Sequence, residues 1–233
     1  MLPARLADVK PSNFLVEGQA TEAGGVIDAW FTFETAVARG RGQLRLKDGK
    51  AWTLLTTMTE LKGFEEKRGV NRIKGAEHGV HPGRKTWAEL REEETRTLGF
   101  TEQPYVVIVG GGQGGIPLGA RLRRLGVPAI IIEKNARPGD GWRKRYKSLC
   151  LHDRVWYDHL PYLPFPDDWP VFAPKDKIGD WLEMYTKVME LNYWGSTVAR
   201  KASYDEATRE WNVIVERDGK EISAPRCGNT GPT

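Results

Sequence analysis

The sequence predicts an α/β protein in which a partial Rossmann-like domain follows a small β-rich α+β segment. A continuous apolar strand at residues 105–109 leads into a glycine-rich turn, and a second apolar strand at 129–132 ends at an acidic residue. Residues 26–62 are instead rich in β-branched and aromatic types. We therefore expect a β-rich segment (1–63), a linker with a charged helix (64–103) and a Rossmann-like domain (104–233).

The β-rich segment is predicted from one strand and one hairpin. Residues 26–33 have strand composition, and strands at 43–46 and 52–56 flank an Asp48-Gly49 turn signal. A strip of this size cannot bury both of its faces alone, so it needs a partner sheet or helices upstream. Only about 25 residues precede it, so we expect the N-terminal domain to be incomplete. The pattern resembles the closing strands of a cone-shaped, SnoaL-like domain, of which this segment would be a part.

The linker is predicted from its composition. Residues 64–82 carry glycines and charges with little apolar periodicity. Residues 84–98 are highly charged, which favours a helix on the protein surface.

The elements of the second domain follow from hydrophobic periodicity. After the glycine turn a helix should run to Leu125 and end at Gly126, which makes a βαβ unit with the strand at 129–132. Downstream, the sequence predicts an amphipathic helix at 175–191 and antiparallel strands at 198–204, 211–216 and 221–222, the last two joined by an Asp218-Gly219 turn. Residues 224–233 have turn composition, so no further strand is expected there.

The glycine turn has the spacing of a dinucleotide-binding fingerprint. Gly110 permits a tight turn, Gly112 lets a pyrophosphate approach the backbone, and Gly115 lets helix and strand pack closely. The phosphates would then lie at the positive end of the helix.

Glu133, 21 positions after the middle glycine, limits which dinucleotide can bind at this turn. Its carboxylate can accept hydrogen bonds from ribose hydroxyls but would repel a 2′-phosphate, at roughly 4 kcal/mol for charges about 4 Å apart and an effective dielectric near 20. NADP is therefore disfavoured at this turn, whereas FAD and NAD both remain open.

Motifs after Glu133 carry a family resemblance. Gly115, Gly119 and Gly126 extend the turn, and the stretches 133–143, 148–153 and 160–166 follow in order. Together they resemble the flavin-containing monooxygenases, which are group B flavoprotein monooxygenases, and most closely the auxin-forming branch. The resemblance covers residues 104–222.

The resemblance implies FAD as cofactor and assigns residues to it. Trp142 and Arg143 would lie on the flavin side, although Trp142 could equally be a packed aromatic residue. Leu151-His152 replaces the Thr-Asn pair of amine-oxygenating members, and His152 is either a polar group near the flavin or a structural histidine. The expected cofactor-binding residues are Gly110, Gly111, Gly112, Gln113, Gly114, Gly115, Glu133, Lys134, Trp142, Arg143 and His152.

The resemblance implies that the full-length family uses NADPH as co-substrate and oxygenates a small molecule. The bound flavin performs the oxidation, and the protein positions it. No catalytic residue is therefore assigned. The second nucleotide-binding domain of that family is not found, so we expect a fragment truncated before the NADPH-binding domain. Two alternatives stay open: a non-catalytic FAD-binding fragment, or another FAD- or NAD-binding oxidoreductase such as an amine oxidase or a dehydrogenase.

Composition excludes several other functions. The 35 basic residues nearly balance 31 acidic ones, which argues against nucleic acid as a partner. Two distant cysteines predict neither disulfides nor a thiolate zinc site, and they fit the cytoplasm. His78 and His81 lack a third ligand, so no metal is expected, and no apolar run is long enough for a membrane span. The oligomeric state stays open.

Overall fold

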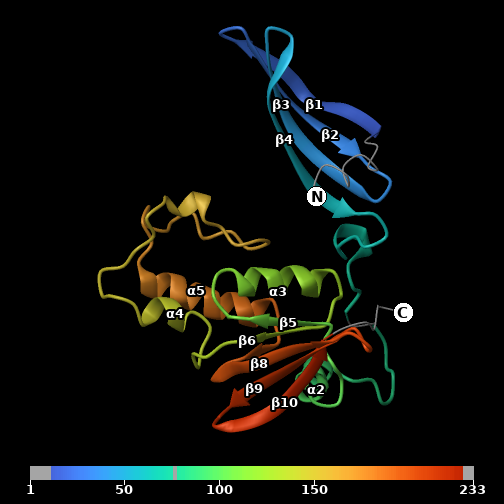
Figure 1. The fold of residues 1–233 in the computed structure, drawn as a ribbon, viewed down its shortest axis with the longest axis vertical. Helices are drawn as coiled ribbons and strands as arrows, with labels where there is room; N and C mark the ends of the chain where they lie inside the picture. Colours follow the sequence, from blue (N-terminus) through green and yellow to red (C-terminus); the bar gives the residue numbers. More distant parts are fainter. Residues whose placement is uncertain (1–11, 76–77, 228–233) are drawn as a thin grey trace. The chain divides into compact units, whose positions relative to one another are not determined.

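The structure is a computed structural model that describes residues 12–75 and 78–227. Its internal contacts divide the chain into two compact units, Met1–Arg68 and Gly69–Thr233, which are described separately below. Figure 1 shows their elements in chain order.

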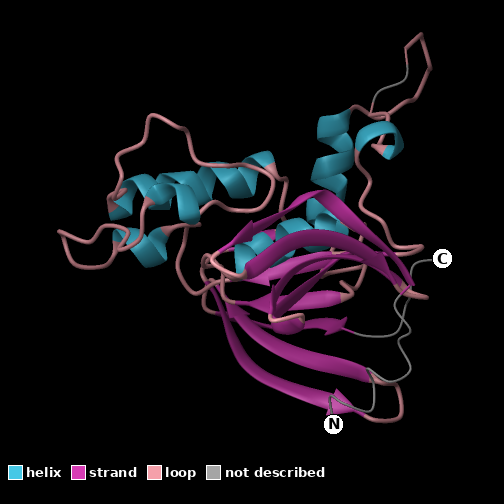
Figure 2. Cartoon of the chain, turned by 90° about the horizontal axis from the view of Figure 1, so that it is seen from above, coloured by secondary structure: helices cyan, strands magenta, loops and turns pink. Residues whose placement is uncertain are grey.

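The first unit is a four-stranded antiparallel meander in the order β1-β2-β3-β4. Asp48 and Gly49 both have positive φ angles, 52° and 72°, as a tight two-residue hairpin requires, so the predicted turn is confirmed. An additional strand, β1, which the sequence did not predict, pairs with β2 along one edge and extends the same sheet. The strands are β1 (Ser12–Ala23), β2 (Val26–Glu34), β3 (Ala38–Lys47) and β4 (Lys50–Leu61), and they curve along their length (Figure 2).

Two glycines of β3 leave room for aromatic rings of β2 on one face of this sheet. A Cβ at Gly42 would lie 2.4 Å from the ring of Phe31, and one at Gly40 would lie 2.3 Å from the ring of Phe33. The ring of Phe14 contacts both phenylalanines. The likeness to a cone-shaped domain stays a prediction.

The charged helix predicted at 84–98 is α2 (Trp87–Thr97). It begins at a capping box in which Thr86 and Glu89 exchange hydrogen bonds, the sequence signature that starts many helices. Glu94 bonds Arg123 at 2.9 Å and Asn192 at 2.9 Å. The helix therefore belongs to the second unit, which differs from the expected linker, and the division between units falls at 68/69. A short 3₁₀ turn, η1 (Gly69–Asn71), precedes it.

The predicted βαβ unit is confirmed and gains a third parallel strand. β5 (Val106–Val109), α3 (Gly115–Arg124) and β6 (Ala129–Ile132) follow the expected bounds closely, and β7 (Tyr193–Trp194) pairs with β6. The sheet order is β5-β6-β7. On one face of the sheet, Ile108 and Ile131 share a buried core with Ile116 and Ala120 of α3 and with residues of the neighbouring helix.

That neighbouring helix is α5 (Lys175–Val188), predicted at 175–191. It packs against the single turn α4 (Asp140–Arg143) at a point of backbone contact, because a Cβ on Gly139 would lie 2.1 Å from the carbonyl oxygen of Gly179. The loop between them contains the 3₁₀ turn η2 (Val155–Tyr157) and Phe165, whose ring stacks on Trp169.

A three-stranded antiparallel sheet covers the other face of the parallel sheet. Its order is β10-β9-β8, with β8 (Thr197–Asp205), β9 (Glu210–Arg217) and β10 (Lys220–Cys227). The expectation of turn structure from residue 224 needs correction, since β10 pairs with β9 as far as Cys227; residues 228–233 lie outside the described part. Pairing to a neighbouring strand overrides local composition here. The shared core contains Leu98, Ile130, Ile132, Trp194, Val213 and Val215.

Candidate dinucleotide site

The glycine turn lies between β5 and α3, and two of its glycines are required by sterics. Gly110 has a φ of 104°, which a residue with a side chain rarely adopts. A Cβ on Gly115 would lie only 1.9 Å from the carbonyl oxygen of Gly110. The close approach of helix and strand predicted for this glycine is thus present in the structure.

The turn has a closed side and an open side. On the closed side, a Cβ on Gly111 would lie 2.4 Å from the ring of Tyr193, and one on Gly119 would lie 2.6 Å from Ile131. On the open side, a Cβ on Gly112 or Gly114 would meet no atom of the described residues within 4 Å. The described residues therefore leave space for a ligand beside the backbone at Gly112 and Gly114.

The backbone N–H groups of this part of the turn are unpaired in the described part of the chain. Within residues 12–75 and 78–227, the N–H groups of Gly112, Gln113 and Gly114 have no hydrogen-bond acceptor. They precede the first turn of α3, where the positive end of the helix dipole adds to the attraction for anions. This arrangement suits a phosphate group, which supplies several acceptor oxygens.

Glu133 follows β6, and its carboxylate reaches back to the turn. One oxygen accepts the Gly111 N–H at 2.8 Å; the other accepts the backbone N–H and the side-chain amide of Asn135, at 2.9 and 2.7 Å. These bonds fix the direction of the carboxylate beside the turn. Lys134, next in the chain, is exposed.

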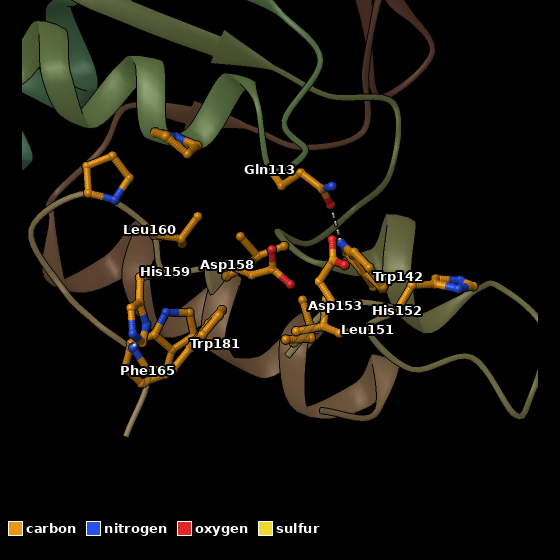
Figure 3. A pocket seen from close by; sticks show the side chains of 14 residues that line it. Gln113, Trp142, Leu151, His152, Asp153, Asp158, His159, Leu160, Phe165 and Trp181 are labelled. Carbon is orange, nitrogen blue, oxygen red and sulfur yellow. Dashed lines mark hydrogen bonds between the residues drawn. The ribbon is translucent and has the colours of Figure 1, made fainter. Parts of the chain in front are cut away.

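Trp142, in α4, is linked directly to the turn. Its indole N–H donates to the side-chain oxygen of Gln113 at 2.7 Å, as Figure 3 shows. Two residues predicted for the same site thus meet although 29 positions separate them in the sequence.

Arg143 faces a different direction, toward α5. Its guanidinium donates to Asp140 at 3.1 Å, to Asp180 at 2.8 Å and to Glu183 at 2.6 Å, and its side chain is 13% exposed. Burial of Asp140 works against its charge, but the hydrogen bonds from Arg143 and the Arg137 backbone hold the pKa of that carboxyl below its ordinary value. These contacts tie α4 to α5.

A cavity of about 490 Å³ opens beside Gln113 and Trp142. Its walls are largely apolar, with the carboxylates of Asp153 and Asp158 among them; in Figure 3 the imidazole of His152 extends away from the space between these side chains. The indole nitrogen of Trp181 is buried without a hydrogen-bond partner in the described part of the chain. The lining residues are Gln113, Pro117, Trp142, Leu151, His152, Asp153, Asp158, His159, Leu160, Pro161, Phe165, Ile178, Trp181 and Leu182.

Sequence reasoning missed several residues of this site. Asn135 and Tyr193 contact Glu133 and the turn, respectively, and Asp153 and Asp158 line the cavity. Asn135 lies in a motif already recognised, so the signal was present there. Tyr193 lies on a two-residue strand, too short for any periodicity to reveal.

The described residues contain neither a cluster of metal ligands nor a membrane-spanning helix. No group of three or more His, Cys, Asp or Glu side chains is placed to hold a metal ion there. No helix in those residues has the length and apolar character needed to cross a membrane.

About half of the chain is similar in sequence to known proteins. No protein-family model matches it. It is 35% identical over 125 residues to the indole-3-pyruvate monooxygenase YUCCA1 of Oryza sativa subsp. japonica, covering 53% of this chain and 30% of the relative. It is 33% identical over 117 residues to the probable indole-3-pyruvate monooxygenase YUCCA9 of Arabidopsis thaliana, covering 50% of this chain and 28% of the relative.

About half of this chain is homologous to flavin-dependent monooxygenases. The resemblance drawn from the motifs is thereby confirmed. Among solved structures, a flavin-containing monooxygenase from Stenotrophomonas maltophilia is 26% identical, with a TM-score of 0.46, over 51% of this chain and 35% of that one. The chain spans about 30% of the length of the curated relatives it matches, so the activity of the whole enzyme is a proposal for this chain.

Proposed function

We propose that residues 104–222 form the FAD-binding part of a flavin-dependent monooxygenase that uses NADPH and O₂ to oxygenate a small molecule. The observation that carries the proposal is the turn. Its backbone N–H groups at Gly112, Gln113 and Gly114 have no acceptor in the described residues, it has open space beside Gly112 and Gly114, and the Glu133 carboxylate is bonded to Gly111. Sequence homology to flavin monooxygenases selects FAD over NAD for this site.

The residues present fit the cofactor at three places. The three free N–H groups would hold the pyrophosphate, because they present donors at the positive end of α3. Glu133 would accept bonds from the ribose hydroxyls, since carboxylate oxygens can accept more than the bonds they already make. Lys134 lies beside it at the surface and would add positive charge near the phosphates.

The cavity would receive the flavin side of the cofactor. Gln113 and Trp142 form one wall, and the apolar lining would exclude water from the reacting part of the ring system. FAD supplies the oxidation–reduction chemistry when bound, and the chain contributes binding and orientation. His152, which lines the cavity, would act at its rim.

Arg143 would act indirectly in this proposal. Its two acidic partners on α5, Asp180 and Glu183, hold α4 against α5, and this contact would set the position of Trp142 one residue earlier. The role suggested by the resemblance, a position on the flavin side, is therefore proposed for Trp142 and not for the Arg143 guanidinium.

The test is cofactor binding by the purified chain. We expect a yellow protein with absorbance near 450 nm, or one that quenches the fluorescence of added FAD, and we expect Glu133→Ala to weaken FAD binding by about 10- to 100-fold through lost ribose bonds and a loosened turn. NAD and NADP serve as competitors. A chain that binds NAD more tightly than FAD, or binds neither, would falsify the proposal.

A further inference from the structure

Tyr193 approaches the glycine turn from β7, on the side opposite the open one. Its ring occupies the space where a side chain on Gly111 would lie, with a ring carbon 2.4 Å and the hydroxyl oxygen 2.5 Å from that Cβ position. The hydroxyl donates to the Gly111 carbonyl oxygen at 3.4 Å. The contact joins residues 82 positions apart and is made across the carboxyl ends of the parallel strands.

Gly111 is consequently held at both of its backbone groups. Its N–H donates to Glu133 at 2.8 Å, and its carbonyl accepts from Tyr193. Glycine has the widest conformational freedom of any residue, so a turn of consecutive glycines loses much entropy when it adopts one shape. Two fixed points at Gly111 reduce the number of shapes that the free turn can adopt.

The carbonyl contact also sets the direction of the next N–H group. The Gly111 carbonyl and the Gly112 N–H belong to one planar trans peptide, in which the two groups point to opposite sides. With the carbonyl directed at Tyr193, the Gly112 N–H is directed to the open side. It is one of the three donors without an acceptor in the described residues.

The Tyr193 hydroxyl keeps its proton for this bond. Burial, and then the nearby carboxylates of Glu133 and Asp140, raise the pKa of this phenol well above its ordinary value. The hydroxyl is therefore protonated, and a hydrogen-bond donor, at neutral pH.

We propose that Tyr193 is a positioning residue of the dinucleotide site: its hydroxyl fixes the Gly111–Gly112 peptide so that the Gly112 N–H faces the pyrophosphate. The inference rests on the proposed function, because it needs a phosphate ligand on the open side. It assigns Tyr193 to the phosphate subsite and leaves the ribose contact to Glu133.

The experiment separates phosphate binding from nucleoside binding. Dissociation constants for ADP and for adenosine are measured on the full chain and on Tyr193→Phe, which keeps the ring and removes the hydroxyl. We expect the variant to bind ADP about three- to ten-fold more weakly, the range of one hydrogen bond, and to bind adenosine within about two-fold of the wild type.

Tyr185→Phe is the matched control. Tyr185 is also buried, and its hydroxyl also donates to a backbone carbonyl, that of Pro161 at 2.8 Å, but within the described residues it makes no hydrogen bond to the turn. This variant should lose stability without changing the ADP constant. An unchanged ADP constant in Tyr193→Phe, or equal losses for ADP and adenosine, would show that Tyr193 is only structural.

A measurement on the wild type keeps the test decisive if the variant does not fold. In NMR spectra of the wild type, the Gly112 amide resonance should shift when ADP is added and should shift much less when adenosine is added. If the resonance does not shift with ADP, the proposed position of this peptide is contradicted. If the wild-type chain binds neither ADP nor FAD, the proposed function itself fails. Binding by the wild type with no effect of Tyr193→Phe overturns the positioning role alone.

Discussion

The carboxylate of Glu94 in α2 lies 2.9 Å from the guanidinium of Arg123 in α3, and it also accepts from the amide of Asn192. Burial works against the charge of Glu94, but these hydrogen bonds and the charges of Arg123 and Arg91 lower its pKa to about 2. The contact connects a helix predicted as part of a linker to the domain that carries the turn.

Glu94→Gln should destabilise the second unit by about 1 kcal/mol at neutral pH, a value that allows for the partial exposure of the pair. A folded-state pKa below the ordinary value means that the contribution is fully present above about pH 4.5 and is lost as the pH falls toward 2. Urea unfolding at pH 7 and pH 3 measures it, and the difference between wild type and variant should shrink at pH 3.

Glu93→Gln is the control for this prediction, since Glu93 lies on the same helix and pairs with the exposed Lys85. Its effect should stay within about 0.5 kcal/mol. A larger loss for Glu93→Gln than for Glu94→Gln would contradict the docking role of Glu94.

Gly115→Ala and Gly114→Ala should separate folding from ligand binding. The first places a methyl group 1.9 Å from the Gly110 carbonyl oxygen, so it should lower stability by about 2 kcal/mol or more. The second meets no atom within 4 Å, so it should leave the midpoint of thermal unfolding unchanged but weaken FAD binding by blocking the open side. Equal effects of the two variants on unfolding would show that the turn is not packed as described.

Arg143→Lys tests whether this residue ties α4 to α5. Lysine keeps the charge but cannot make the several simultaneous hydrogen bonds that the guanidinium makes to Asp140, Asp180 and Glu183. We therefore expect the free energy of unfolding, measured without FAD, to fall by about 1–2 kcal/mol. Arg145→Lys, at an exposed position two residues later, is the control. If Arg143→Lys changed only FAD affinity and left the stability of the free chain unaltered, a direct flavin contact would be favoured instead.

Gly42→Ala tests the first unit. Its methyl group would lie 2.4 Å from the Phe31 ring and 2.7 Å from the Leu55 carbonyl oxygen, so the sheet must shift, and we expect a loss of about 1–3 kcal/mol. Thr57→Ala, at an exposed position of the adjacent β4, should have little effect. Limited proteolysis reports the result: cleavage within residues 12–61 should accelerate only in the Gly42 variant.

The sequence predicted correctly those elements that are determined by residues close to one another along the chain. The structure has the predicted elements at the predicted positions: two Asp-Gly turns, the apolar strands β5 and β6, and the amphipathic helix α5. The strands β1 and β7 and the end of β10 were missed. Each is held mainly by pairing with another strand, and pairing leaves a weak trace in local composition.

The sequence by itself determined the dinucleotide turn and its acid, because the spacing of Gly110, Gly112, Gly115 and Glu133 reflects sterics and charge within one short βαβ unit. Only the tertiary structure decided which side of that turn is open, and it also decided that Arg143 faces α5 and Tyr193 faces the turn. The reason is physical: a side chain's direction and its contacts depend on elements that come from distant parts of the chain. For Tyr193 the distance is 82 residues.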